Sequence, residues 1–129
     1  VASEGSLAEL NERLAAAGHD AVGIERFRPN IVLAGIESHD EDRVDALHIE
    51  TAEGEAELKP VKPCTRCPIP DIDPTTGVSS PEVGDMLRTY RADARVDGRI
   101  TFGMNCIVLQ GVEHMLKVGQ AVGANYRFE

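Results

Sequence analysis

Hydrophobic residues near the start of the chain recur every three or four positions, which is the spacing of one face of a helix. The pattern predicts a helix over Ser6–Ala17, whose apolar face carries Leu7, Leu10 and Leu14. Ser6 and Glu9 have the spacing of a capping box, and Gly18 follows the last turn. We expect a structural role for this helix.

The same spacing returns over Pro81–Tyr90. Ser80 is the expected N-cap, and proline suits the first helical position because the N–H that it lacks has no partner there. One side of this second helix carries Val83, Leu87 and Tyr90.

Short apolar and β-branched runs, separated by turn residues, predict strands in the rest of the chain. These runs are Ile31–Leu33, Ala46–Ile49, Ala56–Val61, Cys106–Leu109 and Leu116–Val122. Their spacing indicates a mainly β protein, a barrel or a sandwich, with a few short peripheral helices.

The composition fits one domain with a hydrophobic core, since 42% of the 129 residues are hydrophobic. No apolar run approaches the ~20 residues of a membrane helix, and no signal sequence is evident. We therefore expect a cytoplasmic protein that does not bind membranes. A net charge of −9 argues against a nucleic-acid partner, because phosphate contacts need a basic surface.

Acidic and basic residues are unevenly placed along the chain. Nine acids lie between residues 37 and 57, namely Glu37, Asp40, Glu41, Asp42, Asp45, Glu50, Glu53, Glu55 and Glu57. We interpret this acidic run as a solvated face. The next segment is basic, with Lys59, Lys62 and Arg66 beside a pair of cysteines, and nearby cations lower the pKa of a thiol.

That pair, Cys64 and Cys67, has the CxxC spacing of zinc ligands and of thiol–disulfide exchange sites. Zinc is disfavoured because no second knuckle accompanies the pair. Exchange chemistry is disfavoured because Pro68 and Pro70 prevent the helix that would stabilise a thiolate. A third interpretation is a single soft metal ligand beside the guanidinium of Arg66, which suits a metal carried by a phosphorylated cofactor.

The sequence resembles the MOSC domain family, which includes the C-terminal part of molybdenum-cofactor sulfurases and the amidoxime-reducing components. The resemblance rests on SEGSLAELNERL, RFRPNIVLAG, KPCTRCPIPDIDPTTG, LRTYR, FGMNCIVL and LKVGQAV, six stretches in the family's order. It implies a β-barrel formed by a single MOSC domain over residues 1–129, truncated at its N-terminal strand. Fused N-terminal barrel, desulfurase and iron–sulfur domains are expected to be absent.

The resemblance also implies the site. Cys67 matches the protein ligand of the molybdenum in the molybdenum cofactor, a metal-bearing phosphorylated pterin, whereas Cys64 is expected to be a small buried packing residue. Thr65 and Arg66 match cofactor contacts beside the ligand. Arg28 and Asn30 match a second contact stretch, and Asn105 matches a further family position.

The function implied is the cofactor-binding part of an oxidoreductase that reduces N-hydroxylated substrates by oxygen transfer to molybdenum. Its expected partners are the small substrate and an electron-donating reductase or iron–sulfur protein. Pyridoxal phosphate enters only by family association and is not expected to bind this chain. No acid or base is assigned, since His39 and His114 are expected to be exposed loop residues.

Two alternatives stay open. The chain could be a sulfur carrier or cofactor-handling module that holds a persulfide on Cys67 beside the cations Lys62 and Arg66. It could instead be a non-catalytic interaction domain whose contact surface is the acidic run.

Overall fold

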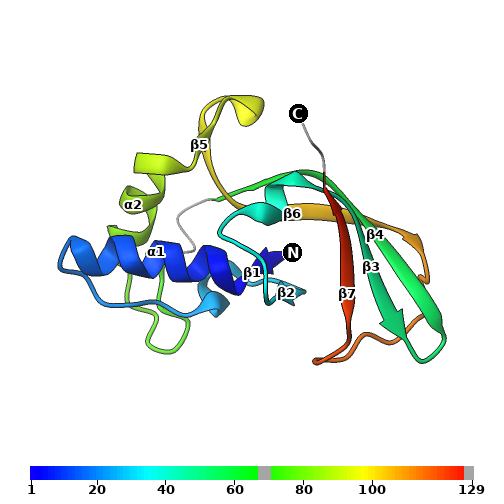
Figure 1. Ribbon diagram of the computed structural model, residues 1–129. Coiled ribbons are helices and arrows are strands. Elements are labelled where there is room, and N and C mark those ends of the chain that lie inside the picture. The colour runs from blue at the N-terminus through cyan, green and yellow to red at the C-terminus, as the bar shows by residue number, and fades with distance from the viewer. Residues whose placement is uncertain (67–70, 127–129) are drawn as a thin grey trace.

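The computed structural model describes residues 1–66 and 71–126, in which helices gather at one end and a curved sheet forms the other (Figure 1). The helical elements are α1 (Glu4–Ala16), η1 (Ile24–Phe27), η2 (Asp40–Arg43), α2 (Glu82–Tyr90) and η4 (Ala94–Val96). The strands are β1 (Ala2–Ser3), β2 (Val32–Leu33), β3 (Val44–Thr51), β4 (Gly54–Thr65), β5 (Ala92–Asp93), β6 (Arg99–Gln110) and β7 (Val122–Tyr126).

Helix α1 confirms the first predicted helix, but its cap differs from the prediction. Ser3 is the N-cap, and its hydroxyl accepts a hydrogen bond from the backbone N–H of Ser6 at 3.1 Å. Ser6 therefore lies inside the helix, where its hydroxyl donates to the carboxylate of Glu41 instead of capping. The predicted Ser6–Glu9 capping box is wrong because the helix begins two residues before Ser6.

Helix α2 confirms the second predicted helix, with Val83 and Leu87 buried. The N-cap is Pro81 rather than Ser80, and the helix begins at Glu82. The carboxylate of Asp71 accepts the backbone N–H of Gly84 at 2.8 Å, so a loop residue distant in sequence satisfies one of the open N–H groups of the first turn.

The main sheet has the strand order β5-β6-β4-β3-β7. Three predicted runs lie inside β3, β4 and β6, and the run Ile31–Leu33 contains β2, so those four strands are confirmed. The fifth, Leu116–Val122, is wrong except for its last residue, which begins β7. Gly119 has a φ of +93°, and Gln120 bonds the backbone of Lys117, so this segment forms a turn.

Strand β4 is central although it contains Pro60 and Pro63, which lack the N–H that a ladder needs. Its register with β6 shifts between Pro60 and Lys62 and again between Pro63 and Thr65. These bulges accommodate both prolines and bend the strand, which carries its end toward the helices.

The mainly β class with peripheral helices is confirmed. In the part of the chain that the structure describes, however, the sheet is open instead of closing into a barrel. Its edges are β5, a strand of two residues, and β7, and each pairs with one neighbour only.

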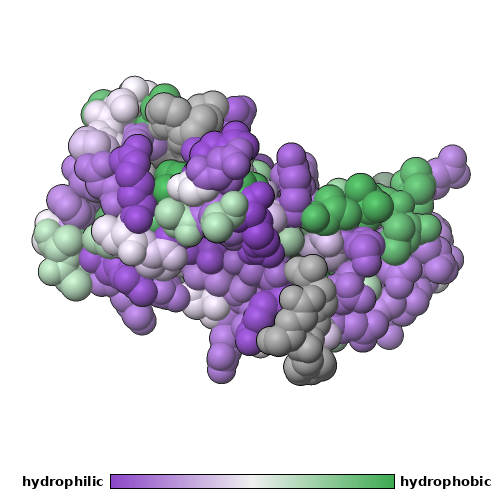
Figure 2. Space-filling model, turned by 90° about the horizontal axis from the view of Figure 1, so that it is seen from above, coloured by the Kyte–Doolittle hydropathy of each residue, from purple (hydrophilic) through white to green (hydrophobic). Residues whose placement is uncertain are grey.

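The core has two clusters. The helical cluster packs Leu10, Leu14, Val83 and Leu87 around two aromatic rings, and the sheet cluster centres on β3 and β4. Neither cluster covers the last four residues of β6, where Ile107, Val108 and Leu109 are 48%, 48% and 51% exposed. Figure 2 shows a hydrophobic patch at that end of the sheet on a largely hydrophilic face.

Candidate cofactor site

Cys67, the predicted metal ligand, lies outside the described residues, so its position stays a prediction. The nearest described residues on either side are Arg66, directly after β4, and Asp71. These two flanking residues and their surroundings define the edge of the candidate site.

Arg66 ties the end of β4 to the core. Its Nε and Nη2 donate to the carbonyl oxygen of Phe102 at 3.0 and 2.6 Å, and its Nη1 donates to that of Phe27 at 2.9 Å. The rings of Phe27 and Phe102 stack with centroids 3.9 Å apart, and the Arg66 guanidinium carbon lies 5.3 Å from the Phe27 centroid. We call this arrangement of three residues the Arg66 clamp.

A glycine makes room for the Arg66 clamp. Gly103 has a φ of +82°, and a Cβ there would lie 2.6 Å from the carbonyl oxygen of Val1 and 3.5 Å from Nη2 of Arg66. Val1 and Met104 exchange two hydrogen bonds beside it, at 2.8 and 2.9 Å. Only glycine allows this left-handed turn of β6 and the close approach of the first residue.

Arg28 lies next to the Arg66 clamp. It ends η1 in the left-handed conformation, with φ 49° and ψ 49°, and its side chain is exposed. Since the preceding residue, Phe27, accepts a hydrogen bond from Nη1 of Arg66, the structure brings the Arg66 guanidinium to the backbone beside Arg28. Arg28 also lines a small cleft with Ile72 and Pro74.

Asn30 is exposed and lines a different, larger cleft, of about 390 Å³, between β2 and the turn that precedes β7. Thr65 is half-buried and pairs with Thr101 of β6. Asn105 is exposed and faces Lys62, three residues before Thr65 on β4. These three residues do not converge on one pocket: Asn30 lies near Ile49 and Val122, toward the β3–β4 hairpin, whereas Thr65 is at the opposite end of β4.

The remaining cysteines are half-buried. Cys64 lies with its Sγ 3.9 Å from the carbonyl oxygen of Thr65, so it is less enclosed than the packing residue predicted. Burial raises the pKa of the Cys106 thiol above its ordinary value, which disfavours the thiolate that a metal needs.

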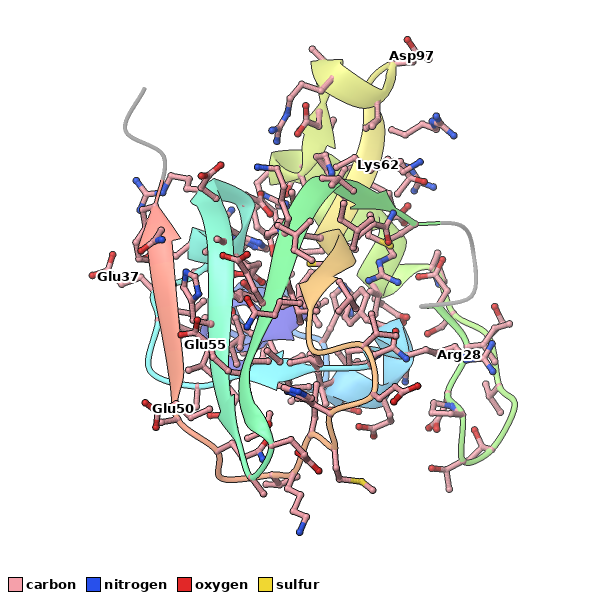
Figure 3. All side chains as sticks on the ribbon, turned by 90° about the vertical axis from the view of Figure 1, so that its right-hand side faces the viewer. Arg28, Glu37, Glu50, Glu55, Lys62 and Asp97 are labelled. Atoms are coloured by element: carbon pink, nitrogen blue, oxygen red, sulfur yellow. The ribbon has the colours of Figure 1, made fainter. Side chains whose placement is uncertain are left out.

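Three residues of the acidic run lie apart from two of the basic residues near the candidate site (Figure 3). Figure 3 shows Glu37, Glu50 and Glu55 on the side of β3 and β7, whereas Arg28 and Lys62 lie toward the other side. Glu41 is an exception to the solvated acidic face, because it is only 1% exposed and accepts the hydroxyls of Ser3 and Ser6 at 3.0 and 2.7 Å.

Burial raises the pKa of Glu41 above its ordinary value, against the effect of these two hydrogen bonds. The neighbouring Asp42 is a second exception, since it pairs with Arg91 at 2.7 Å and both side chains are nearly buried.

His39 and His114 lie in loops as predicted, but the prediction that they are exposed is wrong. The ring of His39 is half-buried, edge-on to Phe102 and Tyr90 with centroids 5.5 and 5.8 Å apart, and both its nitrogens are buried without a hydrogen bond. Burial and then the charge of Arg91 lower its pKa to about 4. His114 is also half-buried, with Nδ1 3.2 Å from the hydroxyl of Thr51.

The sequence interpretation missed a third cleft. It has a volume of about 270 Å³ and lies beside both residues that flank the undescribed segment. Two arginines to which the sequence analysis gave no role, Arg88 within LRTYR and Arg99, line it together with Arg66 and Asp71. Asp85 lies three residues before Arg88, a spacing that lets opposite charges pair on one face of a helix. This spacing was the sequence signal that Arg88 lies on an exposed, charged face of α2.

Residues 1–66 and 71–126 contain no group of three or more histidine, cysteine or acidic side chains placed to hold a metal ion. Among the same residues, no helix has the length and apolar character needed to span a membrane.

The chain matches the model of the MOSC domain over residues 1–123. It is 44% identical over 92 residues to mitochondrial amidoxime-reducing component 1 of Homo sapiens, a match covering 70% of this chain and 25% of that protein. It is also 42% identical over 90 residues to mitochondrial amidoxime reducing component 2 of Rattus norvegicus, and this match covers 69% of this chain and 24% of that protein.

Molybdenum cofactor sulfurase of Arabidopsis thaliana is 35% identical over 107 residues, which cover 78% of this chain and 12% of that protein. This chain thus spans about a quarter or less of the length of these relatives. Because the family model covers nearly all of its residues, the chain belongs to the MOSC domain family.

Proposed function

We propose that this chain is the molybdenum-cofactor-binding part of an oxidoreductase that reduces N-hydroxylated compounds. The observation that carries the proposal is the 44% identity to an amidoxime-reducing component over 70% of the chain, together with the intact CTRC segment. Cys67 would be the metal ligand, and the cofactor would supply the two-electron chemistry that removes oxygen from an N–OH group.

The described donors are of the chemical types that a phosphorylated pterin needs, although Arg28 and Asn30 line different clefts. Arg28 offers an exposed guanidinium for a phosphate, and Asn30 and Thr65 offer an amide and a hydroxyl for the polar edges of a pterin. Asn105 is a further exposed amide on β6. Arg66 would act mainly by position, because three of its N–H groups already bind carbonyl oxygens of Phe27 and Phe102.

The Arg66 clamp gives the site a fixed base. It fixes Arg66, the last residue before Cys67, to a buried aromatic pair. The chain would therefore extend toward Cys67, the proposed metal ligand, from a fixed position. A small N-hydroxylated substrate and an electron-donating reductase or iron–sulfur protein would be the partners. We keep the cytoplasm as the proposed location, although the similar animal proteins are named as mitochondrial.

The test is reductive activity in protein produced by a host that makes the cofactor. An aromatic amidoxime and a chemical electron donor are supplied, and the amidine product is measured. The parent chain should form amidine, Cys67→Ala should not, and Cys64→Ala should retain most of the activity. Full activity in Cys67→Ala would contradict the proposal.

Similarity to molybdenum cofactor sulfurase supports a second candidate, a sulfur carrier with a persulfide on Cys67. The nearby cations Lys62 and Arg66 would stabilise the thiolate that accepts the sulfur. Mass spectrometry after incubation with a cysteine desulfurase and cysteine tests this candidate. One added sulfur atom on Cys67, absent from Cys67→Ser, would favour it over the reductase.

A further inference from the structure

The cleft of about 270 Å³ between α2 and the start of β6 carries an excess of positive charge. Its charged wall residues are Arg66, Arg88, Arg99 and Asp71. Two wall glycines, Gly84 and Gly98, keep side chains out of the space between them. A Cβ on Gly84 would lie only 3.0 Å from Oδ2 of Asp71.

The carboxylate in this cleft is already engaged. Oδ1 of Asp71 accepts the backbone N–H of Gly84 at 2.8 Å, in the first turn of α2, where the helix favours negative charge. Arg66 is held by carbonyl oxygens and contributes its charge from a fixed position. Three arginines against one aspartate leave an excess of positive charge on the walls of the cleft, on a protein whose net charge is −9.

The other two arginines keep donors available. Arg88 donates from Nη1 to Asp85 at 2.6 Å, and Arg99 donates from Nε to the carbonyl oxygen of Val96 at 3.1 Å. Each of these bonds uses one of the five N–H groups of a guanidinium. Arg88 and Arg99 come from a helix and from the start of a strand, so their planar groups approach the cleft from two elements.

We propose that this cleft binds the phosphate monoester of a small organic molecule, with Arg88 and Arg99 as its principal contacts. A carboxylate presents two oxygens and one negative charge, whereas a phosphate monoester presents three terminal oxygens and up to two negative charges, so it is the better match for two guanidiniums on different elements. The volume leaves room for a phosphate and the first atoms of the group that bears it.

The cleft lies next to the proposed reaction site, because Arg66 directly precedes Cys67 in the chain. The phosphate could belong to an N-hydroxylated substrate or to the cofactor itself. This choice of source rests on the proposed function, but the binding of phosphate by the cofactor-free chain does not.

The experiment is an NMR titration of the cofactor-free chain with inorganic phosphate, with acetate as the comparison anion. The backbone amides of Gly84 and Gly98 should shift with phosphate and much less with acetate. Arg88→Ala and Arg99→Ala should each weaken phosphate binding about tenfold to hundredfold, the usual effect of losing a charge-assisted contact.

Two further variants sharpen the test. Arg95→Ala is the matched control, since Arg95 lies in η4, four residues before Arg99, but pairs with Asp93 and does not line the cleft. Phosphate binding should be unchanged in this variant. Asp85→Asn removes the negative charge beside Arg88 and should tighten phosphate binding severalfold, because a competing acceptor is weakened.

Equal phosphate affinity in the parent, Arg88→Ala and Arg99→Ala would overturn the proposal, as would equal shifts with acetate. Repeating the titration on cofactor-loaded protein identifies the source. Loss of phosphate binding on loading assigns the cleft to the cofactor's phosphate, and retained binding assigns it to a substrate. If no cofactor can be loaded, the proposed function fails while the cofactor-free titration still decides the cleft.

Discussion

Replacing Arg66 by alanine should destabilise the protein even when no cofactor is present. The change leaves the carbonyl oxygens of Phe27 and Phe102 without their charged donor, next to rings that are 1% and 0% exposed. Hydrogen bonds to a charged group contribute about 1.5–3 kcal/mol each, and because Arg66 is half-buried, water can replace part of that loss. We therefore expect the free energy of unfolding to fall by about 2–4 kcal/mol.

Denaturant unfolding of the cofactor-free protein, followed by circular dichroism, measures this loss. Arg28→Ala is the control, since Arg28 lies beside Phe27 with an exposed side chain and should change stability by less than about 0.5 kcal/mol. Arg66→Lys should recover only part of the loss, because one ammonium cannot reproduce the planar fork that reaches both carbonyls. An Arg66→Ala protein as stable as Arg28→Ala would refute the clamp and leave Arg66 as a ligand contact only.

Three more predictions concern buried groups. Burial lowers the pKa of His39 from 6.5 to about 4, so its contribution to stability is present above pH 6.5 and is lost toward pH 4; His39→Asn should flatten that slope in denaturant titrations. Burial raises the pKa of Glu41 above 4.5, so its contribution is largest below that pH, and Glu41→Gln should cost less stability at pH 7 than at pH 4. Gly103→Ala should lower stability in thermal unfolding by more than about 1 kcal/mol and by more than Gly119→Ala, because both glycines have positive φ but only Gly103 would clash with Val1.

The helices could be predicted because their apolar faces repeat at a regular spacing. Their starts could not, since they depend on tertiary contacts: Ser3 caps α1, and Asp71 reaches Gly84 across a loop. Ser6 shows the limit of local patterns. Its spacing to Glu9 fits a capping box, yet its hydroxyl faces a glutamate 35 residues away.

The strands show a similar limit. Pro63 argues locally against a strand, but bulges let β4 continue to Thr65. Leu116–Val122 is apolar enough for a strand, but the left-handed backbone at Gly119 makes it a turn. Closure of the sheet into a barrel would require its two edge strands to pair, and a local sequence pattern does not predict which distant strands pair.

For the candidate site too, the sequence identified residues but not their contacts. The motif identified Arg28, Asn30, Thr65 and Arg66, but sequence could not show that the Arg66 guanidinium is committed to carbonyl oxygens. Arg88 and Arg99 come together only through the packing of α2 beside β6. Nothing in the sequence distinguishes these two arginines from other surface arginines, and only the fold shows that they line the same cleft.

The central claim is that Cys67 holds a molybdenum cofactor, and the most direct test is the molybdenum and pterin content of the purified chain. The protein is produced in a host that makes the cofactor, beside Cys67→Ser and the control Cys64→Ser. We predict that the parent and Cys64→Ser retain molybdenum and pterin in equal amounts, and that Cys67→Ser retains much less molybdenum because a hydroxyl is a harder and normally protonated ligand. Zinc in place of molybdenum, lost equally from both variants and with no pterin in the parent, would contradict the account.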